Sequence, residues 1–113
     1  MNFRSLDVYQ HAIRFLALAL GLAERTPAGY CHLRDPLRRA ATSIPLNIAE
    51  GSGKTTGADQ RRFYAIARGS AMECAALLDV LRVAEPPEIE RLDGADALLG
   101  SIVRMASKLV TTR

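Results

Sequence analysis

Aromatic residues are scarce in this chain of 113 residues, which contains no tryptophan, three tyrosines and three phenylalanines. Aromatic and β-branched residues favour strands, whereas alanine and leucine favour helices. Apolar residues nevertheless make up 49% of the chain, so the apolar share rests mostly on small and aliphatic side chains. This balance favours close-packed helices over sheets.

Long apolar runs are also missing, since a membrane-spanning helix needs about 20 apolar residues in succession. The segment from Phe15 to Ala23 is short and lies between Arg14 and Glu24, so we expect a core helix there and no membrane partner. The first residues lack the charged-then-apolar order of a secretory signal. We therefore expect a cytoplasmic protein.

Cysteine and histidine occur only twice each. Cys31 and Cys74 form no paired-cysteine motif, and His11 and His32 belong to no cluster with metal-ligand spacing. No combination of residues indicates a nucleophile or a metal site. We therefore expect no metal, no cofactor and no catalytic residue, and a protein that is not an enzyme.

The segment Gly51-Ser52-Gly53-Lys54-Thr55 is similar to the end of a phosphate-binding loop. In that motif a glycine stands five residues before the one that precedes the lysine, and here Ile48 occupies that position. A strand should also precede the loop, whereas this segment follows a predicted helix. We interpret it as a turn between helices, in which Lys54 can still contact a phosphate of a nucleic acid.

Apolar residues recur at three- and four-residue spacing through most of the chain, which is typical of helices with one buried face. Glycine and proline interrupt this pattern at Pro27, at residues 51–57 and at Pro86-Pro87. The sequence therefore predicts four helices, which run from Ser5 or Leu6 to Glu24, from His32 or Leu33 to about Glu50, from about Ala58 to Ala84, and from Glu88 or Leu92 to Val110.

Short connections favour antiparallel neighbours. A chain of 113 residues is also too short for two independent cores. We expect an all-α fold, an antiparallel up-down-up-down four-helix bundle, in one domain over residues 1–113. The inner faces are predicted at Leu6, Tyr9, Ile13, Leu16 and Leu20; at Leu33, Leu37, Ala41, Ile44 and Ile48; at Phe63, Ile66, Ala67, Ser70, Cys74, Leu77 and Leu81; and at Ala95, Leu99, Ile102, Ala106 and Leu109.

Charge is unevenly distributed along the chain, although the net charge is only +3. Residues 34–68 include seven basic and three acidic residues, whereas residues 69–100 include two basic and seven acidic residues. The guanidinium group of arginine offers a planar fork to phosphate oxygens. The basic segment therefore indicates a nucleic-acid-binding surface, for which we select Arg38, Arg61, Arg62, Arg68 and Lys54.

A second interpretation of the same charges stays open. The arginines could instead pair with acids such as Glu50 or Glu73, within the bundle or across a contact between subunits. In that case the protein would be a structural scaffold for protein–protein recognition and would bind no nucleic acid.

Two runs of residues stand out in the middle of the chain. They are Arg39-Ala40-Ala41-x-Ser43-Ile44-Pro45-x-Asn47-Ile48-Ala49-Glu50-Gly51 and Phe63-x-x-Ile66-Ala67-x-Gly69-Ser70-x-x-Glu73. Together they closely resemble a known family, the four-helix-bundle proteins encoded in intervening sequences of 23S ribosomal RNA genes. The start of the chain, Phe3-x-x-Leu6-x-Val8-Tyr9, is also similar to the start of that family. The similarity covers nearly the whole chain and is weakest in the connectors and after Pro87.

The resemblance implies a bundle that assembles as a homopentamer, with no enzymatic activity established for the family. A related branch, the accessory proteins of diversity-generating retroelements, forms pentameric barrels that bind nucleic acid and a reverse transcriptase. We therefore expect a non-enzymatic homo-oligomer that binds RNA, DNA or a nucleic-acid-handling protein, such as a reverse transcriptase, through its basic surface.

The residues of the two runs are expected to be mainly architectural. Pro45 removes one helical hydrogen bond and crowds the carbonyl group of Ala41, which predicts a bend in the second helix. Gly69 and Ala71 should let a neighbouring helix approach closely. We assign this structural role to Arg39, Ser43, Pro45, Asn47, Glu50, Gly51, Gly69, Ser70 and Glu73, with Glu73 as the expected partner of Arg39.

Overall fold

A computed structural model describes residues 2–84 and 89–111, with the backbone alone at residues 84 and 89–91. Helices, and no strand, form the secondary structure of these described ranges. A short 3-10 helix, η1 (Asn2–Ser5), precedes the first long helix, and a second, η2 (Ala28–Leu33), follows it. The long helices are α1 (Asp7–Arg25), α2 (Arg34–Ser52), α3 (Gly57–Ala84) and α4 (Ile89–Thr111).

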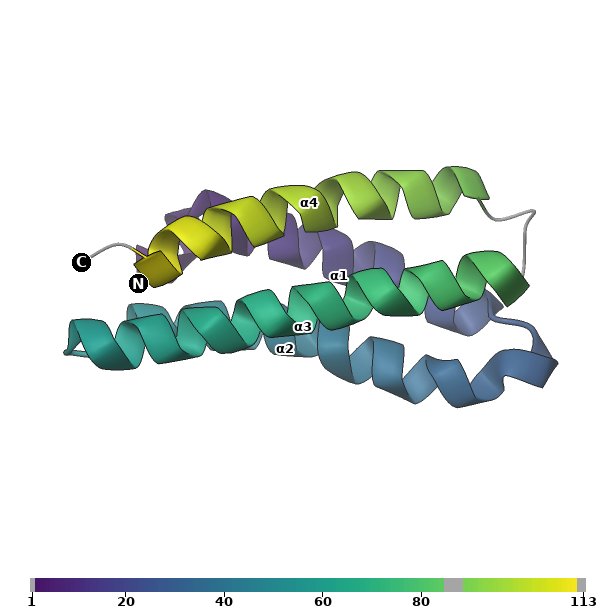
Figure 1. The fold of residues 1–113 in the computed structure, drawn as a ribbon, viewed down its shortest axis with the longest axis horizontal. Coiled ribbons are helices and arrows are strands. Elements are labelled where there is room, and N and C mark those ends of the chain that lie inside the picture. The colour runs from purple at the N-terminus through teal and green to yellow at the C-terminus, as the bar shows by residue number, and fades with distance from the viewer. Residues whose placement is uncertain (1, 85–88, 112–113) are drawn as a thin grey trace.

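Consecutive helices run in opposite directions, and both ends of the chain lie at the same end of the bundle (Figure 1). Each helix packs against the next, and α4 packs back against α1. The bundle measures 45 × 22 × 21 Å. The predicted all-α, antiparallel four-helix bundle is confirmed, although the predicted break at Pro86-Pro87 lies outside the described residues.

The inner faces predicted for the second and fourth helices are confirmed. All five positions predicted for the second helix, such as Leu37 and Ile44, are buried, although the first of them, Leu33, is the last residue of η2. Four of the five predicted positions of α4, such as Leu99 and Ile102, are buried, and Leu109 packs against the edge of the core. These two helices each have a single apolar stripe, so periodicity alone identifies the inner face.

The inner face predicted for the first helix is correct only in part, since Leu6, Tyr9 and Leu16 pack against the core while half-buried. Ile13 and Leu20 are 40% and 41% exposed, while Phe15 and the alanines beside it on the same face are fully buried. α1 has two apolar stripes, and the stripe that faces inward combines alanines with one large ring. Small side chains let the neighbouring helices approach closely, so this stripe, formed by Val8, Ala12, Phe15, Ala19, Leu22 and Ala23, lies in the core.

The inner face predicted for α3 is correct only in part. Ala67, Cys74 and Leu81 are buried, but Ile66 is 42% exposed, and Phe63, Ser70 and Leu77 are half-buried. Tyr64, Ala71 and Leu78 are buried instead of them. The core therefore meets α3 at a face rotated slightly from the predicted one, because α2 and α4 both pack on this helix and share its surface.

Pro45 and Gly51 are two residues of α2 that are unusual inside a helix, and both are buried. Pro45 is buried and the helix continues through it, while the bend predicted there stays a prediction. Gly51 contacts α3 so closely that a Cβ at this position would lie 2.8 Å from Cε1 of Tyr64. The close approach predicted at Gly69 is wrong within this chain, because Gly69 is exposed and a Cβ there would meet nothing within 4 Å.

Candidate nucleic-acid interface

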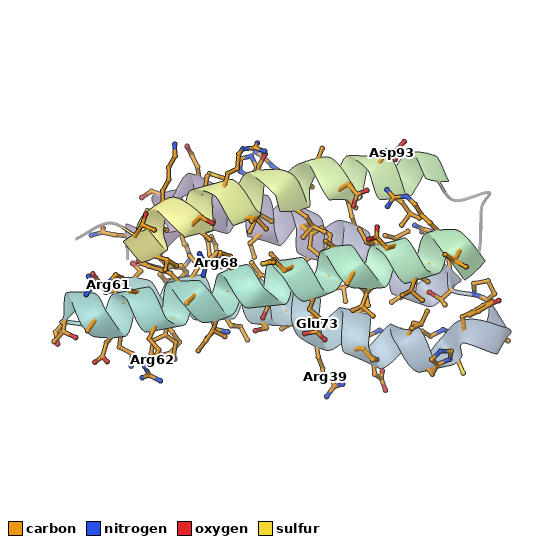
Figure 2. All side chains as sticks on the ribbon, in the orientation of Figure 1. Arg39, Arg61, Arg62, Arg68, Glu73 and Asp93 are labelled. Carbon is orange, nitrogen blue, oxygen red and sulfur yellow. The ribbon has the colours of Figure 1, made fainter. Side chains whose placement is uncertain are left out.

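The predicted basic residues do not converge on one surface. Arg61 and Arg68 are seven residues apart, so they share one face of α3, and Figure 2 shows both on the side towards α4. Arg62 projects to the opposite side, where Arg39 of α2 also projects (Figure 2). The candidate set is thus divided between two faces of the bundle.

Lys54 and Arg62 are brought together by the ring of Phe63. Lys54 Nζ lies 4.9 Å from the ring centroid, and Arg62 Cζ lies 4.7 Å from it. Lys54 also forms an ion pair of 3.4 Å with Glu50, one helical turn earlier. A cation over an aromatic face is attracted by the ring quadrupole, so Phe63 holds two positive charges at the connection between α2 and α3.

The remaining candidate on α2, Arg38, is partly neutralised. Its Nη1 lies 3.3 Å from Oδ1 of Asp35, and the Asp35 side chain is largely exposed. An exposed ion pair of this kind contributes only about 0–1 kcal/mol. Arg38 can therefore exchange this acid for a phosphate at little cost.

Hydrogen bonds join the predicted architectural residues across the seam between α2 and α3. Nδ2 of Asn47 donates to the carbonyl oxygen of Ser43 at 2.8 Å and to its Oγ at 2.9 Å. The same Oγ lies 2.8 Å from Oγ of Ser70 on α3. This chain of polar groups fixes how the two helices meet near the middle of the bundle.

Arg39 and Glu73 lie on the same seam but form no ion pair with each other. They line one shallow hollow together with Pro36, Ser43 and Ser70, and both are exposed. Figure 2 shows the Arg39 side chain pointing away from the bundle. The predicted pairing of Arg39 with Glu73 is therefore absent from the single chain.

A second hollow, of about 430 Å³, lies on the outer face of α2 beside the cation pair. It is lined by Leu46, Ala49, Glu50, Gly53 and Lys54. Leu46 is 60% exposed, so the floor of the hollow is apolar and open to solvent. Lys54 belongs both to this hollow and to the cation pair on Phe63.

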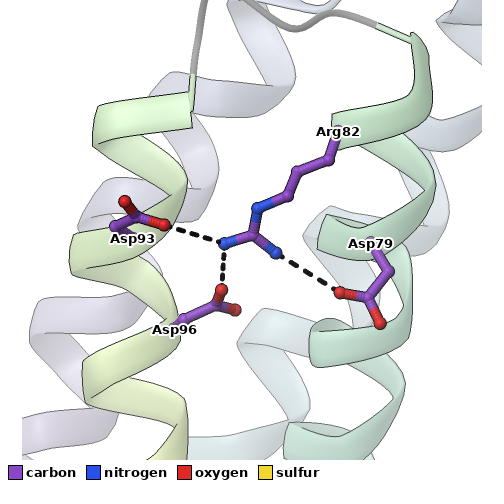
Figure 3. Close-up of polar contacts among 4 residues, drawn as sticks. All are labelled: Asp79, Arg82, Asp93 and Asp96. Atoms are coloured by element: carbon purple, nitrogen blue, oxygen red, sulfur yellow. Dashed lines mark hydrogen bonds and ion pairs between the residues drawn. The ribbon is translucent and has the colours of Figure 1, made fainter.

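The sequence analysis missed a cluster at the other end of the bundle. Arg82 of α3 contacts Asp79 at 3.3 Å, Asp93 at 3.3 Å and also Asp96, the last two from α4 (Figure 3). The hydrogen bond to Asp96 is the main reason why the pKa of Arg82 is raised. Arg82 is one of only two basic residues in the acidic segment 69–100, and this was the available signal for the contact.

The cysteines and histidines are dispersed. Cys74 is fully buried, and burial raises the pKa of its thiol to about 12, so it is a weak nucleophile. Cys31 is exposed. Nδ1 of His11 lies 2.8 Å from the carbonyl oxygen of Asp7 on its own helix. Among the side chains that the structure describes, at residues 2–83 and 92–111, no group of three His, Cys, Asp or Glu is placed to hold a metal ion.

The family of the chain follows from comparison with known proteins. No helix among the described residues is long and apolar enough to cross a membrane, and no curated protein matches the chain. A family model described as 23S rRNA-intervening sequence protein matches residues 4–108. The match includes α1, α2 and α3 in full, α4 as far as Lys108, the Lys54–Arg62 pair and the polar seam, and the chain belongs to the 23S rRNA-intervening sequence protein family.

Proposed function

We propose that this protein is a non-enzymatic homo-oligomer that binds nucleic acid, or a nucleic-acid-handling protein such as a reverse transcriptase, through a basic surface. The observation that carries the proposal is the pair of cations, Lys54 and Arg62, which both lie within 5 Å of the centroid of the half-buried Phe63 ring. Cations that are already in place lose less conformational freedom when a phosphate binds. Arg38 lies near the start of α2, towards the other end of this helix from the pair, and adds a positive charge there.

Assembly strengthens this attraction, since each copy in a symmetric ring repeats the same charges. The five-fold ring that the resemblance implies would present five such pairs. Support for assembly comes from the second apolar stripe of α1, where Ile13 and Leu20 are exposed in the single chain. Exposed apolar side chains in a regular row are typical of a surface that another protein covers.

The test is binding of mixed RNA and DNA oligonucleotides at several salt concentrations. The double variant Lys54→Glu with Arg62→Glu should lose at least about tenfold in affinity at low salt, and its dependence on salt should become weaker. Arg4→Glu with Arg104→Glu makes the same change in net charge on other helices and should have a much smaller effect. The proposal is wrong if the native protein binds no oligonucleotide even at low salt, or if both double variants behave alike.

A second function, a scaffold for protein recognition, is favoured by the seam between α2 and α3. Arg39 and Glu73 are exposed there without an ion pair between them, and Arg39 lines a neighbouring hollow together with the exposed side chain of Leu46. Opposite charges around apolar side chains suit a protein partner. Under this alternative, Arg39→Glu would dissociate the oligomer or a bound protein, as seen by sedimentation, and nucleic acid would not bind at all.

A further inference from the structure

We propose that the hollow beside Lys54 holds one base of a single-stranded nucleic acid, while Lys54 and Arg62 bind the phosphates that flank this base. The inference rests on the proposed nucleic-acid binding and specifies its form. A single strand, rather than a duplex, is the ligand because it can turn an unstacked base towards the protein.

The shape of the charged surface favours a strand. Lys54 and Arg62 contact the same ring, so they form a compact pair, whereas Arg61 and Arg68 point to a different side of α3 (Figure 2). A rigid duplex needs cations spread along a surface that follows its two backbones. A flexible strand can place neighbouring phosphates on two adjacent cations.

The chemistry of the hollow suits the flat face of a base. Leu46 and Ala49 supply apolar contacts, and Gly53 has no side chain that would cover them. The hollow, at about 430 Å³, has room for one base. Every base has an apolar π-face, so contacts of this kind tolerate different sequences.

The aromatic residues near the arginines have separate roles in this arrangement. Tyr64 is 8% exposed and packs on Gly51, so it cannot stack on a base. Phe63 is half-buried and holds the two cations. A guanidinium group that lies on a ring still has an outer face, on which a base can stack.

Glu50 does not prevent this binding. Its Oε2 lies 3.4 Å from Lys54 Nζ, but the Glu50 side chain is 58% exposed, and such an ion pair is weak in water. Lys54 can therefore turn from this carboxylate to a phosphate. The rest of the rim carries no acid, because the other lining residues are Leu46, Ala49 and Gly53.

The experiment compares a five-nucleotide strand, as RNA and as DNA, with a longer hairpin duplex, using NMR titration of the full-length protein. The methyl resonances of Leu46 and the ring resonances of Phe63 should shift with the single strand, and those of Val83, at the other end of α3, should not. RNA and DNA should both produce these shifts, since base faces and phosphates are common to them. With two phosphates contacted, log K should fall with log salt at a slope of about −1.4.

Variants separate the base contact from the charge contact. Leu46→Ser should lower the affinity for the single strand at least about fivefold, since it removes apolar contact area. It should leave the affinity for the duplex unchanged. Val83→Ser is the matched control, because Val83 is 87% exposed. Arg62→Gln should lower the affinity for the strand and reduce the slope of log K against log salt by about 0.7. The control is Arg4→Gln, which removes an arginine from a similar position over Phe3 and should change neither quantity.

Two results would overturn the inference in distinguishable ways. If duplex and strand bind equally and Leu46→Ser changes neither, the base site is wrong while nucleic-acid binding stands. If no strand or duplex binds at low salt, or if only a protein partner shifts the Leu46 methyl groups, the proposed nucleic-acid binding is wrong and the base site with it.

Discussion

Gly51 and Tyr64 are in contact across the end of the α2–α3 seam, where a Cβ at position 51 would lie 2.8 Å from Cε1 and 3.0 Å from Cδ1 of the ring. Gln60 O would also lie 3.2 Å from this Cβ. These neighbours cannot easily move away from a Cβ at position 51, because they are a buried ring and a backbone oxygen rather than the end of a flexible side chain. This glycine is required by space rather than by an unusual backbone angle.

Gly51→Ala should therefore destabilise the protein by about 1–3 kcal/mol, the range for overpacking in a core. Denaturant unfolding measures the change in the free energy of unfolding. Gly69→Ala is the control, since nothing lies within 4 Å of its Cβ position. At position 69, alanine has a higher helix propensity than glycine, so the free energy of unfolding should stay unchanged or rise by up to about 1 kcal/mol. Equal effects at both sites would contradict the contact with Tyr64.

The bonds among Asn47, Ser43 and Ser70 predict a coupled response. Asn47→Ala should lower the free energy of unfolding by about 1 kcal/mol, because it removes a donor that bonds Ser43 twice. In a double-mutant cycle, Ser43→Ala and Ser70→Ala together should cost less than the sum of the single changes, since each single variant leaves the other hydroxyl without its partner. Strict additivity would count against the Ser43–Ser70 bond.

The buried thiol of Cys74 predicts a loss of stability at alkaline pH. The pKa of Cys74 is raised from 9.0 to about 12, chiefly by burial and also by Glu73. Between these values the unfolded chain loses the proton and the folded chain keeps it, so stability should fall by up to about 1.4 kcal/mol per pH unit as pH rises from 9 towards 12. The free energy of unfolding of Cys74→Ala, measured at pH 8 and pH 10.5, should decline less than that of the native protein.

If the protein assembles as proposed, the exposed apolar stripe of α1 should lie in the contact between subunits. Ile13→Asp with Leu20→Asp should yield a folded chain that no longer forms an oligomer, because both side chains are partly exposed in the single chain and a charge there resists burial between subunits. Native mass spectrometry reports the oligomer and circular dichroism the helix content. Val83→Asp, on a side chain that is 87% exposed, should keep the oligomer. An intact oligomer in the double variant would place the contact elsewhere.

Removal of the acid next to Lys54 should strengthen nucleic-acid binding. Glu50→Gln keeps the size of the side chain but removes a negative charge 3.4 Å from Lys54 Nζ, so the affinity for an oligonucleotide should rise about two- to threefold at low salt and less at high salt. Fluorescence anisotropy measures this gain. Asp59→Asn, also exposed near the start of α3, is the control for a general change in net charge.

The fold could be predicted from the sequence because periodicity and chain breaks act locally. The stripe of α2, from Leu33 to Ile48, has no competing apolar face, and it is buried as predicted. In α1 two stripes satisfy the same spacing, and only the packing of Ala12, Ala19 and Phe15 against other helices decides between them. Local patterns contain no information on that choice.

The site was less predictable, because its contacts join residues that are distant in the chain. Arg62 was selected from its charge, and it lies over its sequence neighbour Phe63, but the position of Lys54 over the same ring depends on how the chain turns between α2 and α3. The predicted pair of Arg39 with Glu73 lies on the correct seam, yet the two side chains form no ion pair. Arg82 was overlooked because its partners Asp93 and Asp96 belong to the next helix.

The cluster around Arg82 makes the two ends of the bundle differ in charge. Three aspartates share this one arginine near the α3–α4 connection, while Lys54 and Arg62 lie at the α2–α3 connection, at the opposite end of a body 45 Å long. Such a separation of charge acts as a molecular dipole that turns the protein in the field of an anion before contact. A nucleic-acid strand would thus meet the protein end-on, and the rate of association, more than the lifetime of the complex, would respond to salt.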